Sequence, residues 1–222
     1  MKKFNRLFPS LALAATLSAA LFATPLRAQD GAHYRGSPLG SKVRIAGSSN
    51  IHDWTMDGTL VVGSFDLPPG VELDSAQADI AGLKDNKIAA HAEVSIPVNS
   101  MQSGTDGMDS VMQQAMNAKD YPRIVYSLHE LAFKGPHTPN TPFQFEAKGE
   151  LSLNGVTNKI TMPVTIENAD KKKLRIIGSV PLKMTDFKVP PPVKLGIFTT
   201  VPDVKISFEW ILTRHDKPAG AK

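Results

Sequence analysis

Histidine and aspartate are the residue types in this chain that could carry acid–base or metal chemistry. His52 and Asp53 are adjacent, but neighbouring residues in a strand point to opposite faces, so the two cannot form a dyad. His52 and Trp54 would share a face, which favours packing of the imidazole beside the indole. The histidines show neither His-x-His nor His-x-x-x-His spacing, so the sequence predicts no metal site. They are His33, His52, His91, His129, His137 and His215.

The usual nucleophile motifs are also missing from the sequence. It contains no cysteine and no Gly-x-Ser-x-Gly segment. Asp106 and Asp109 stand where a helix is expected to begin, and carboxylates are stabilised there by the helix dipole. The sequence therefore predicts that the protein is not an enzyme, and an enzyme acting on a lipid is a distant third hypothesis.

The first 28 residues have the composition of a secretory signal peptide. A basic start is followed by the apolar run Leu11 to Ala23 and by a small residue, Ala28, before Gln29. The apolar run is shorter than the roughly 20 residues of a membrane span, which disfavours the alternative of a transmembrane anchor. We expect export to the periplasm, with an extracellular location less favoured. The missing cysteines exclude a lipoprotein anchor and a disulfide framework.

Charge argues against a nucleic-acid partner. The full chain has 25 Lys and Arg against 21 Asp and Glu, and all four basic residues of the signal segment leave with it. The remaining chain has 21 of each sign, so its basicity belongs to export. We expect no nucleic-acid binding and no stable membrane insertion after signal cleavage.

Alternating apolar and polar residues predict an all-β domain over residues 41–213. The clearest hairpin runs from Gly149 to Ile166 around Asn154-Gly155, two residues that tolerate positive φ. Its second strand is expected to begin at Ile160, which predicts a turn wider than two residues. Residues 29–40 form an expected loose leader, and residues 214–222 a polar tail. Strands are predicted at residues 42–46, 54–65, 71–83, 87–98, 123–133, 143–153, 160–166, 174–182 and 204–212.

One segment has helical rather than strand periodicity. Apolar side chains recur at Met108, Val111, Met112, Ala115 and Met116, which is one face of a short amphipathic helix. Thr105 or Asp106 could cap this helix, and Tyr121-Pro122 would end it.

The strand pattern leaves two architectures, a sandwich and an up-and-down barrel. Short, hairpin-like connections favour an antiparallel eight-stranded barrel, whose closure also removes exposed edges. A barrel of that size is either filled by its own side chains or holds one small ligand. From alternation alone, a solid core is the simpler reading. The lining would be apolar in both cases.

The sequence resembles the YceI-like polyisoprenoid-binding family from about Ser41 to Leu212. The most specific part is the strand–turn–strand segment from Gly149 to Val164. Supporting segments are Ser48 to Trp54, Val94 to Val98 with Ser100, Tyr121 to Tyr126, and Met184 to Phe187. The resemblance implies an exported lipocalin-like barrel that carries a long isoprenoid chain in an elongated pocket, and it is compatible with a homodimer.

The resemblance and the alternation together give a set of expected ligand-binding residues. They are Ile96, Ile124, Tyr126, Leu128, Phe143, Phe145, Leu151, Leu153, Met162, Val164, Ile206 and Phe208. Met108, Met112 and Met116 could form a lid over the lipid, or they could cap the barrel end without touching it. No cofactor is expected beyond a bound polyisoprenoid or quinone-like lipid. The competing hypothesis is a ligand-free structural or interaction module with a solid core.

Overall fold

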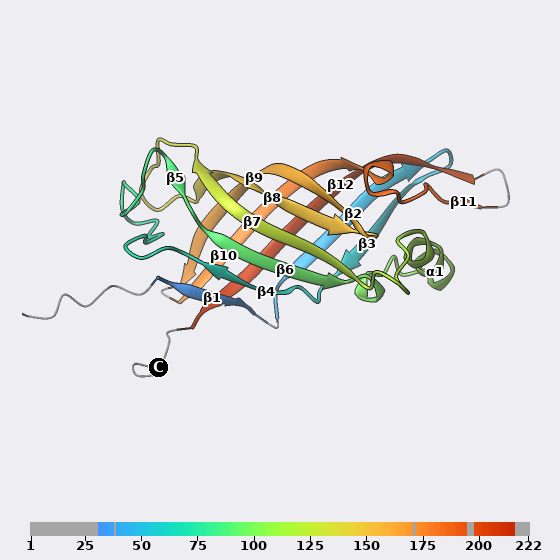
Figure 1. The fold of residues 1–222 in the computed structure, drawn as a ribbon, viewed down its shortest axis with the longest axis horizontal. Helices are drawn as coiled ribbons and strands as arrows, with labels where there is room; N and C mark the ends of the chain where they lie inside the picture. The colour runs from blue at the N-terminus through green and yellow to red at the C-terminus, as the bar shows by residue number, and fades with distance from the viewer. Residues whose placement is uncertain (1–30, 38, 171, 195–197, 216–222) are drawn as a thin grey trace, which may run out of the picture.

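The protein is a closed antiparallel β-barrel, described by a computed structural model for residues 31–37, 39–170, 172–194 and 198–215 (Figure 1). Eight strands form a ring in the order β1-β4-β6-β7-β8-β9-β10-β12, and β12 pairs with β1 to close it. These strands are β1 (His33–Gly36), β4 (Val62–Asp66), β6 (His91–Pro97), β7 (Arg123–Phe133), β8 (Phe143–Leu153), β9 (Val156–Asp170), β10 (Lys173–Lys183) and β12 (Phe198–Arg214). The predicted all-β, eight-stranded antiparallel barrel is confirmed.

The long strand β12 serves two parts of the wall. One edge pairs with β10 from Asp203 to Thr213. The other edge pairs with β1 near Arg214 and, further back, with β2 (Lys42–Ser49), which in turn pairs with β3 (Asp53–Gly58). The barrel wall therefore divides at β12, with β1 on one path and β2–β3 on the other. Among the described strands, no ladder joins β3 to β6, which leaves a gap at one end of the barrel.

The gap between β3 and β6 is covered by the segment that follows β6. It contains η1 (Val98–Ser100) and α1 (Asp106–Ala115), and Figure 1 places α1 beside β3. Asp57 of β3 exchanges two backbone hydrogen bonds with Gln102, at 2.7 and 2.9 Å. Met101 beside it is fully buried. Among the described residues, no backbone hydrogen bond joins α1 itself to a strand, so side-chain packing holds this cover.

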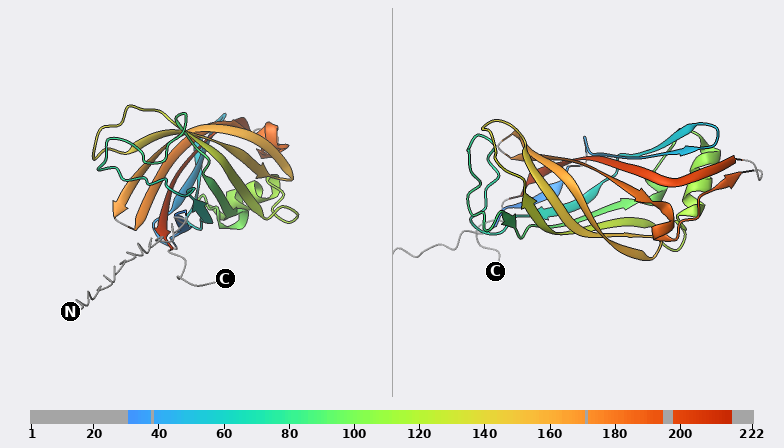
Figure 2. Two further views of the ribbon diagram at one scale, coloured as in Figure 1. Left: turned by 60° about the vertical axis from the view of Figure 1, so that its left-hand side comes forward. Right: turned by 90° about the horizontal axis from the view of Figure 1, so that it is seen from above.

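The opposite end of the barrel is covered by the loop between β4 and β5 (Figure 2). Loop residues 67–86 and the two-residue strand β5 (Lys87–Ile88) bring buried side chains over this end, and β5 pairs with β7. Phe133, Phe143 and Phe145 pack together, with ring centroids 5.6 to 6.3 Å apart, and His137 lies 4.0 Å from Phe143. We call these four rings, together with the side chains of Leu67, Val71, Leu73 and Ile80 from the loop and Ile88 from β5, the plug.

The helix lies where the periodicity predicts it, but it ends at Ala115 and not at Tyr121-Pro122 as predicted. It covers Asp106–Ala115, and Met116 is its C-cap. Thr105 occupies the N-cap position but makes no side-chain cap hydrogen bond. The Asp109 carboxylate instead accepts hydrogen bonds from the backbone N–H and the hydroxyl of Ser103, which fixes the loop before the helix.

Several strand predictions need correction in the first half of the chain. The expected leader 29–40 contains β1, whose Tyr34 is buried against Phe65 with ring centroids 6.1 Å apart. Four residues are too few to show periodicity. The segment 54–65 splits into β3 and β4, and 87–98 splits into β5 and β6. The predicted strand 71–83 is a loop, because its apolar residues fill the plug instead of one face of a sheet.

The hairpin from Gly149 to Ile166 is tighter than predicted. Leu153 pairs directly with Val156, so Asn154-Gly155 is a two-residue turn, with φ of 51° and 73°. The predicted wider turn is wrong because Val156 and the polar residues Thr157 to Lys159 continue the ladder. Strand β12 also extends to Arg214, into the expected tail. The predicted signal peptide lies outside the described residues.

The remaining short elements lie at the α1 end. They are η2 (Met184–Phe187) and β11 (Val193–Lys194), and β11 pairs with β12. No helix in the described part of the chain is long and apolar enough to cross a membrane.

Candidate functional site: an apolar cavity inside the barrel

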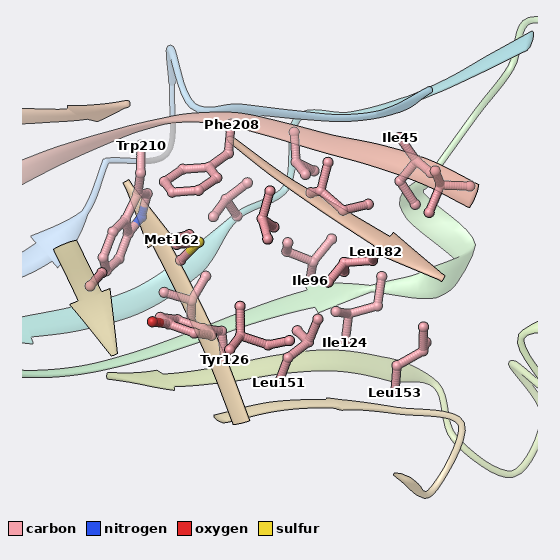
Figure 3. A pocket seen from close by; sticks show the side chains of 18 of the residues that line it. Ile45, Ile96, Ile124, Tyr126, Leu151, Leu153, Met162, Leu182, Phe208 and Trp210 are labelled. Carbon is pink, nitrogen blue, oxygen red and sulfur yellow. The ribbon is translucent and has the colours of Figure 1, made fainter. Parts of the chain in front are cut away.

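A cavity of about 180 Å³ lies inside the barrel. Its wall is made by the inward side chains of the ring strands, as alternation requires, and its surface is almost entirely carbon and sulfur (Figure 3). On β12 the lining runs from Val204 to Trp210, and on β9 from Ile160 to Ile166. Six residue steps span about 20 Å along a strand, and the tilt of barrel strands reduces this to about 15 Å along the axis.

Most of the sequence-predicted residues lie on this wall. The ten that line the cavity are Ile96, Ile124, Tyr126, Leu128, Leu151, Leu153, Met162, Val164, Ile206 and Phe208. Phe143 and Phe145 do not line it, because they belong to the plug. Alternation indicates that a side chain points inward, but it does not give the height along the barrel at which the side chain lies.

The predicted lid residues divide in the same way. Met112 and Met116 are buried and line the cavity, whereas Met108 is half-buried against the core and does not reach it. The last turn of α1 and its C-cap therefore close the side of the cavity between β3 and β6.

Further lining residues come from parts of the chain that the prediction did not include. Val43, Ile45 and Trp54 come from the branch β2–β3, and Met101 comes from the covering segment. Met184, Phe187 and Val189 come from η2 and the residue after its cap. Trp210 alternates with Phe208 and could have been found from periodicity. Val43 and Ile45 also alternate within the predicted strand 42–46, whereas Met101, Met184, Phe187 and Val189 lie in short or irregular segments that carry no such signal.

Glycines on the wall keep aromatic rings out of the centre of the barrel. A Cβ placed on Gly178 would lie 2.5 Å from Cζ of Phe208, its direct cross-strand neighbour, so this ring lies across the glycine. Gly149 accommodates the Tyr126 ring in the same way, with 2.7 Å from a built Cβ to the hydroxyl oxygen. Large side chains that would fill the barrel are thereby laid along its wall.

Two buried donors in the lining have no hydrogen-bond partner among the described residues. They are the Tyr126 hydroxyl and the Trp210 indole N–H. Burial raises the pKa of Tyr126 to about 12, so the hydroxyl is protonated at neutral pH. Trp54, in contrast, donates its indole N–H to the Ser48 carbonyl oxygen at 3.2 Å.

Charged groups lie on the outer face of this wall. Lys42, Lys183 and Glu209 border the cavity, but Lys42 and Glu209 pair with each other at 2.8 Å. Arg175 also bonds Glu209 at 2.6 Å and Glu167 at 2.7 Å, so one network spans β9, β10, β12 and β2. The Arg175 hydrogen bond lowers the pKa of Glu209. These ions stabilise the strands from outside. Lys183 is exposed, and the cavity surface that the described residues form is almost entirely carbon and sulfur.

Comparison with known proteins identifies the domain. A model of the YceI-like domain matches residues 38–211. The chain belongs to the YceI-like family. None of the curated protein sequences matches it.

Two solved structures share the YceI-like fold of this chain. Burkholderia cenocepacia BcnA has a TM-score of 0.58 at 18% identity, and the match covers 79% of this chain and 98% of that one. A polyisoprenoid binding domain from Saccharophagus degradans, implicated in plant cell wall breakdown, has a TM-score of 0.59 at 13% identity, covering 82% and 98%. At these identities the likeness establishes the fold.

The strand–turn–strand segment that resembles the YceI-like family has a structural role at the α1 end. Asn154 adopts positive φ in the turn, and its side-chain amide donates to the carbonyl oxygens of Phe187 and Lys188, at 3.2 and 3.0 Å. Asn158 donates to Asp186 at 2.8 Å. The hairpin therefore holds η2 in place, and η2 supplies Met184 and Phe187 to the cavity.

The histidines of this YceI-like domain do not assemble into a ligand set. Among the described residues, no three His, Asp or Glu side chains are placed to hold a metal ion. His52 precedes β3, is exposed and bonds the carbonyl oxygen of Asp53, so the predicted burial beside Trp54 is wrong. His33 contacts Asp66, and His137 contacts the carbonyl oxygen of Ser75.

Proposed function

We propose that this YceI-like protein is an exported carrier that holds a polyisoprenoid or similar long apolar chain inside its barrel, for transport or sequestration. The continuous apolar cavity carries the proposal. Its axial length of about 15 Å is close to half of the roughly 30 Å hydrocarbon core of a bilayer, which is the depth that one lipid chain occupies.

The energetics favour a long chain over a small apolar molecule. Each buried methylene contributes about 0.8 kcal/mol, whereas association costs about 4 kcal/mol or more. Ten buried methylenes therefore contribute about 8 kcal/mol, enough to exceed the lower association cost, while a five-carbon ligand does not. The described lumen has an almost entirely apolar surface, so affinity has to come from buried length.

The related domain from Saccharophagus degradans, described as polyisoprenoid binding, supports an isoprenoid as the chain. The methionines Met112 and Met116 support α1 as a lid, because flexible thioether side chains adapt to irregular apolar ligands. The apolar segment before Ala28 supports a periplasmic location.

Native mass spectrometry of the mature protein purified from its own host tests this function directly. The expected result is a bound mass that solvent extraction identifies as a polyprenyl lipid. The polypeptide mass should correspond to a chain that begins near Gln29. An empty protein that also fails to take up an added polyprenyl lipid would contradict the carrier function and favour the ligand-free module with a solid core.

A further inference from the structure

One stretch of the barrel wall is fastened more weakly than its neighbours. On one side, β3 pairs with β2 from Asp53 to Gly58. On the other side a single residue pair holds it, in which Asp57 exchanges two backbone hydrogen bonds with Gln102. Beyond this pair, no backbone hydrogen bond among the described residues joins β3 to the connection between β6 and β7, and Thr55 is exposed. This margin of β3 can therefore separate from its neighbour without breaking a ladder.

The connection between β6 and β7 is anchored at its root. Just beyond the β6–β7 ladder, the Val98 N–H donates to the Pro122 carbonyl oxygen at 2.9 Å, so the two ends of the connection are held together. We call residues 98–122 the flap, and α1 lies within it beside β3 (Figure 1). A rotation of the flap about this root would break the Gln102 contact and open a slot between β3 and β6.

The inner face of the flap is apolar and forms part of the cavity wall. Met101, Met112 and Met116 are buried, and all three line the cavity. Met101 lies directly over Gly58 of β3, where a built Cβ would be 2.5 Å from the Met101 Sδ atom. Opening the flap exposes these methionines to water, which is unfavourable unless a lipid replaces the lost contacts. The closed flap is therefore the stable state in water.

The two ends of the barrel are closed more firmly than this side. At one end, the rings of the plug pack with centroids 4.0 to 6.3 Å apart. At the other end, the side chains of Asn154 and Asn158 donate three hydrogen bonds that hold η2. Entry through either end disrupts these contacts, whereas entry past β3 separates one backbone pair and the methionine packing.

We propose that the flap is a side gate, whose latch is the Asp57–Gln102 pair and whose opening admits a lipid chain sideways between β3 and β6. The margin from Asp53 to Asp57 spans about 13 Å along the strand, about two thirds of the length of the cavity lining. A long chain can therefore cross the wall over much of its length at once. The gate rests on the proposed carrier function for its ligand, but its motion belongs to the ligand-free protein.

A disulfide across the latch tests the gate. Residues that exchange both hydrogen bonds of an antiparallel pair have Cα atoms about 5.5 Å apart, which suits a disulfide. The wild-type chain has no cysteine, so Asp57→Cys/Gln102→Cys forms a single bridge, and its reduced form is its own control. Ser152→Cys/Thr157→Cys is the matched control bridge. Its two hydroxyls lie 2.6 Å apart in the β8–β9 ladder, which does not include the flap.

The readout is the rate of lipid uptake and release. Both tryptophans of the chain, Trp54 and Trp210, line the cavity, so a brominated prenyl alcohol that enters it should quench their fluorescence. In stopped-flow mixing, oxidation of the latch variant should slow uptake and release equally, by roughly tenfold or more, because the two latch hydrogen bonds can no longer separate. The affinity should not change, and oxidation of the control bridge should leave both rates unchanged.

A second pair of variants weakens the latch instead of locking it. Gln102→Pro removes the N–H that donates to Asp57, whereas Gln102→Ala keeps both backbone hydrogen bonds. Met101 has φ of −82° and ψ of 125°, an extended conformation that a following proline accepts. Uptake by Gln102→Pro should be about 2- to 13-fold faster than uptake by Gln102→Ala, the equivalent of one net hydrogen bond.

Two results would overturn the gate. Equal uptake by the oxidised and reduced latch variant would show that lipid does not pass β3, and equal uptake by the two Gln102 variants would show that this pair is no latch. If the wild-type protein shows no quenching at equilibrium, the carrier function itself fails. Hydrogen exchange of the ligand-free protein then decides the gate, which requires faster exchange of residues 98–122 in the reduced latch variant than in the oxidised one.

Discussion

Gly178→Ala is the substitution that best separates a hollow barrel from a filled one. The built Cβ lies 2.5 and 2.8 Å from two ring carbons of Phe208 and 3.0 Å from Cγ1 of Val164. Ordinary carbon contacts are about 3.5 to 4.0 Å, so the Phe208 ring must move about 1 Å away from β10. Phe208 lines the cavity, so its ring can move into the lumen.

The magnitude depends on whether that lumen is empty. In a hollow barrel the ring moves into free space, and the alanine regains about 0.5 to 1 kcal/mol of backbone entropy, so stability should change by less than about 1 kcal/mol. In a filled barrel the extra methyl overpacks the core and costs about 1 to 3 kcal/mol. The displaced ring would exclude about one or two methylenes of a bound chain, which weakens binding about 4- to 15-fold.

The assay combines urea denaturation with titration of a polyprenyl lipid. Gly107→Ala is the control, because a Cβ there meets no atom within 4 Å and the helix tolerates alanine. Near-neutral stability with weakened lipid binding supports a hollow, occupied lumen. A loss of 2 kcal/mol or more would refute the reasoning about free space, and unchanged lipid affinity would show that the ligand does not reach Phe208.

Three further predictions follow from the described contacts. Met112→Asp should fold but lose bound lipid, whereas Met108→Asp should keep it; unchanged lipid content in folded Met112→Asp would contradict the lid. Asn154→Gly keeps the positive φ but removes the two hydrogen bonds to η2, and should lower the free energy of unfolding by about 1 to 2 kcal/mol in urea. Folding raises the pKa of Tyr126 from 10.0 to about 12, so its contribution is complete below pH 10 and is lost as the pH rises through 12. Stability measured against pH should fall over that range by no more than about 2 kcal/mol, and Tyr126→Phe should remove this part of the fall.

Long strands with two different faces could be predicted closely from the sequence. The strands Arg123–Phe133 and Phe143–Leu153 have the predicted bounds, because polarity alternates over their whole length. Prediction failed where apolar residues are buried without forming one face of a sheet. Val71, Leu73 and Ile80 read as a strand, but they are buried by capping the barrel end from a loop.

The sequence predicts which side chains point into the barrel, but it does not predict the size or the position of the cavity. Period two assigns side chains such as Phe143 and Ile206 to the interior alike, yet only Ile206 reaches the cavity. The position of each side chain along the barrel axis depends on strand tilt and on the plug. Both depend on pairings between strands that are distant in sequence. The space itself depends on Gly178 and Gly149, and a glycine in a strand gives no sign of which ring will lie across it.

The pairing of β1 with β12 also determines how this molecule can fold. Tyr34 is the register partner of Arg214, and the His215 N–H donates to the His33 carbonyl oxygen at 2.8 Å. Barrel closure therefore joins residues about as far apart in sequence as the domain allows, and such contacts slow folding. Circular permutation should change this: linking residue 32 to residue 215 and opening the chain at the exposed residues 141 and 142, beyond His137 of the plug, would make the closing contact local. The same barrel would then form by a faster route, with its cavity unchanged.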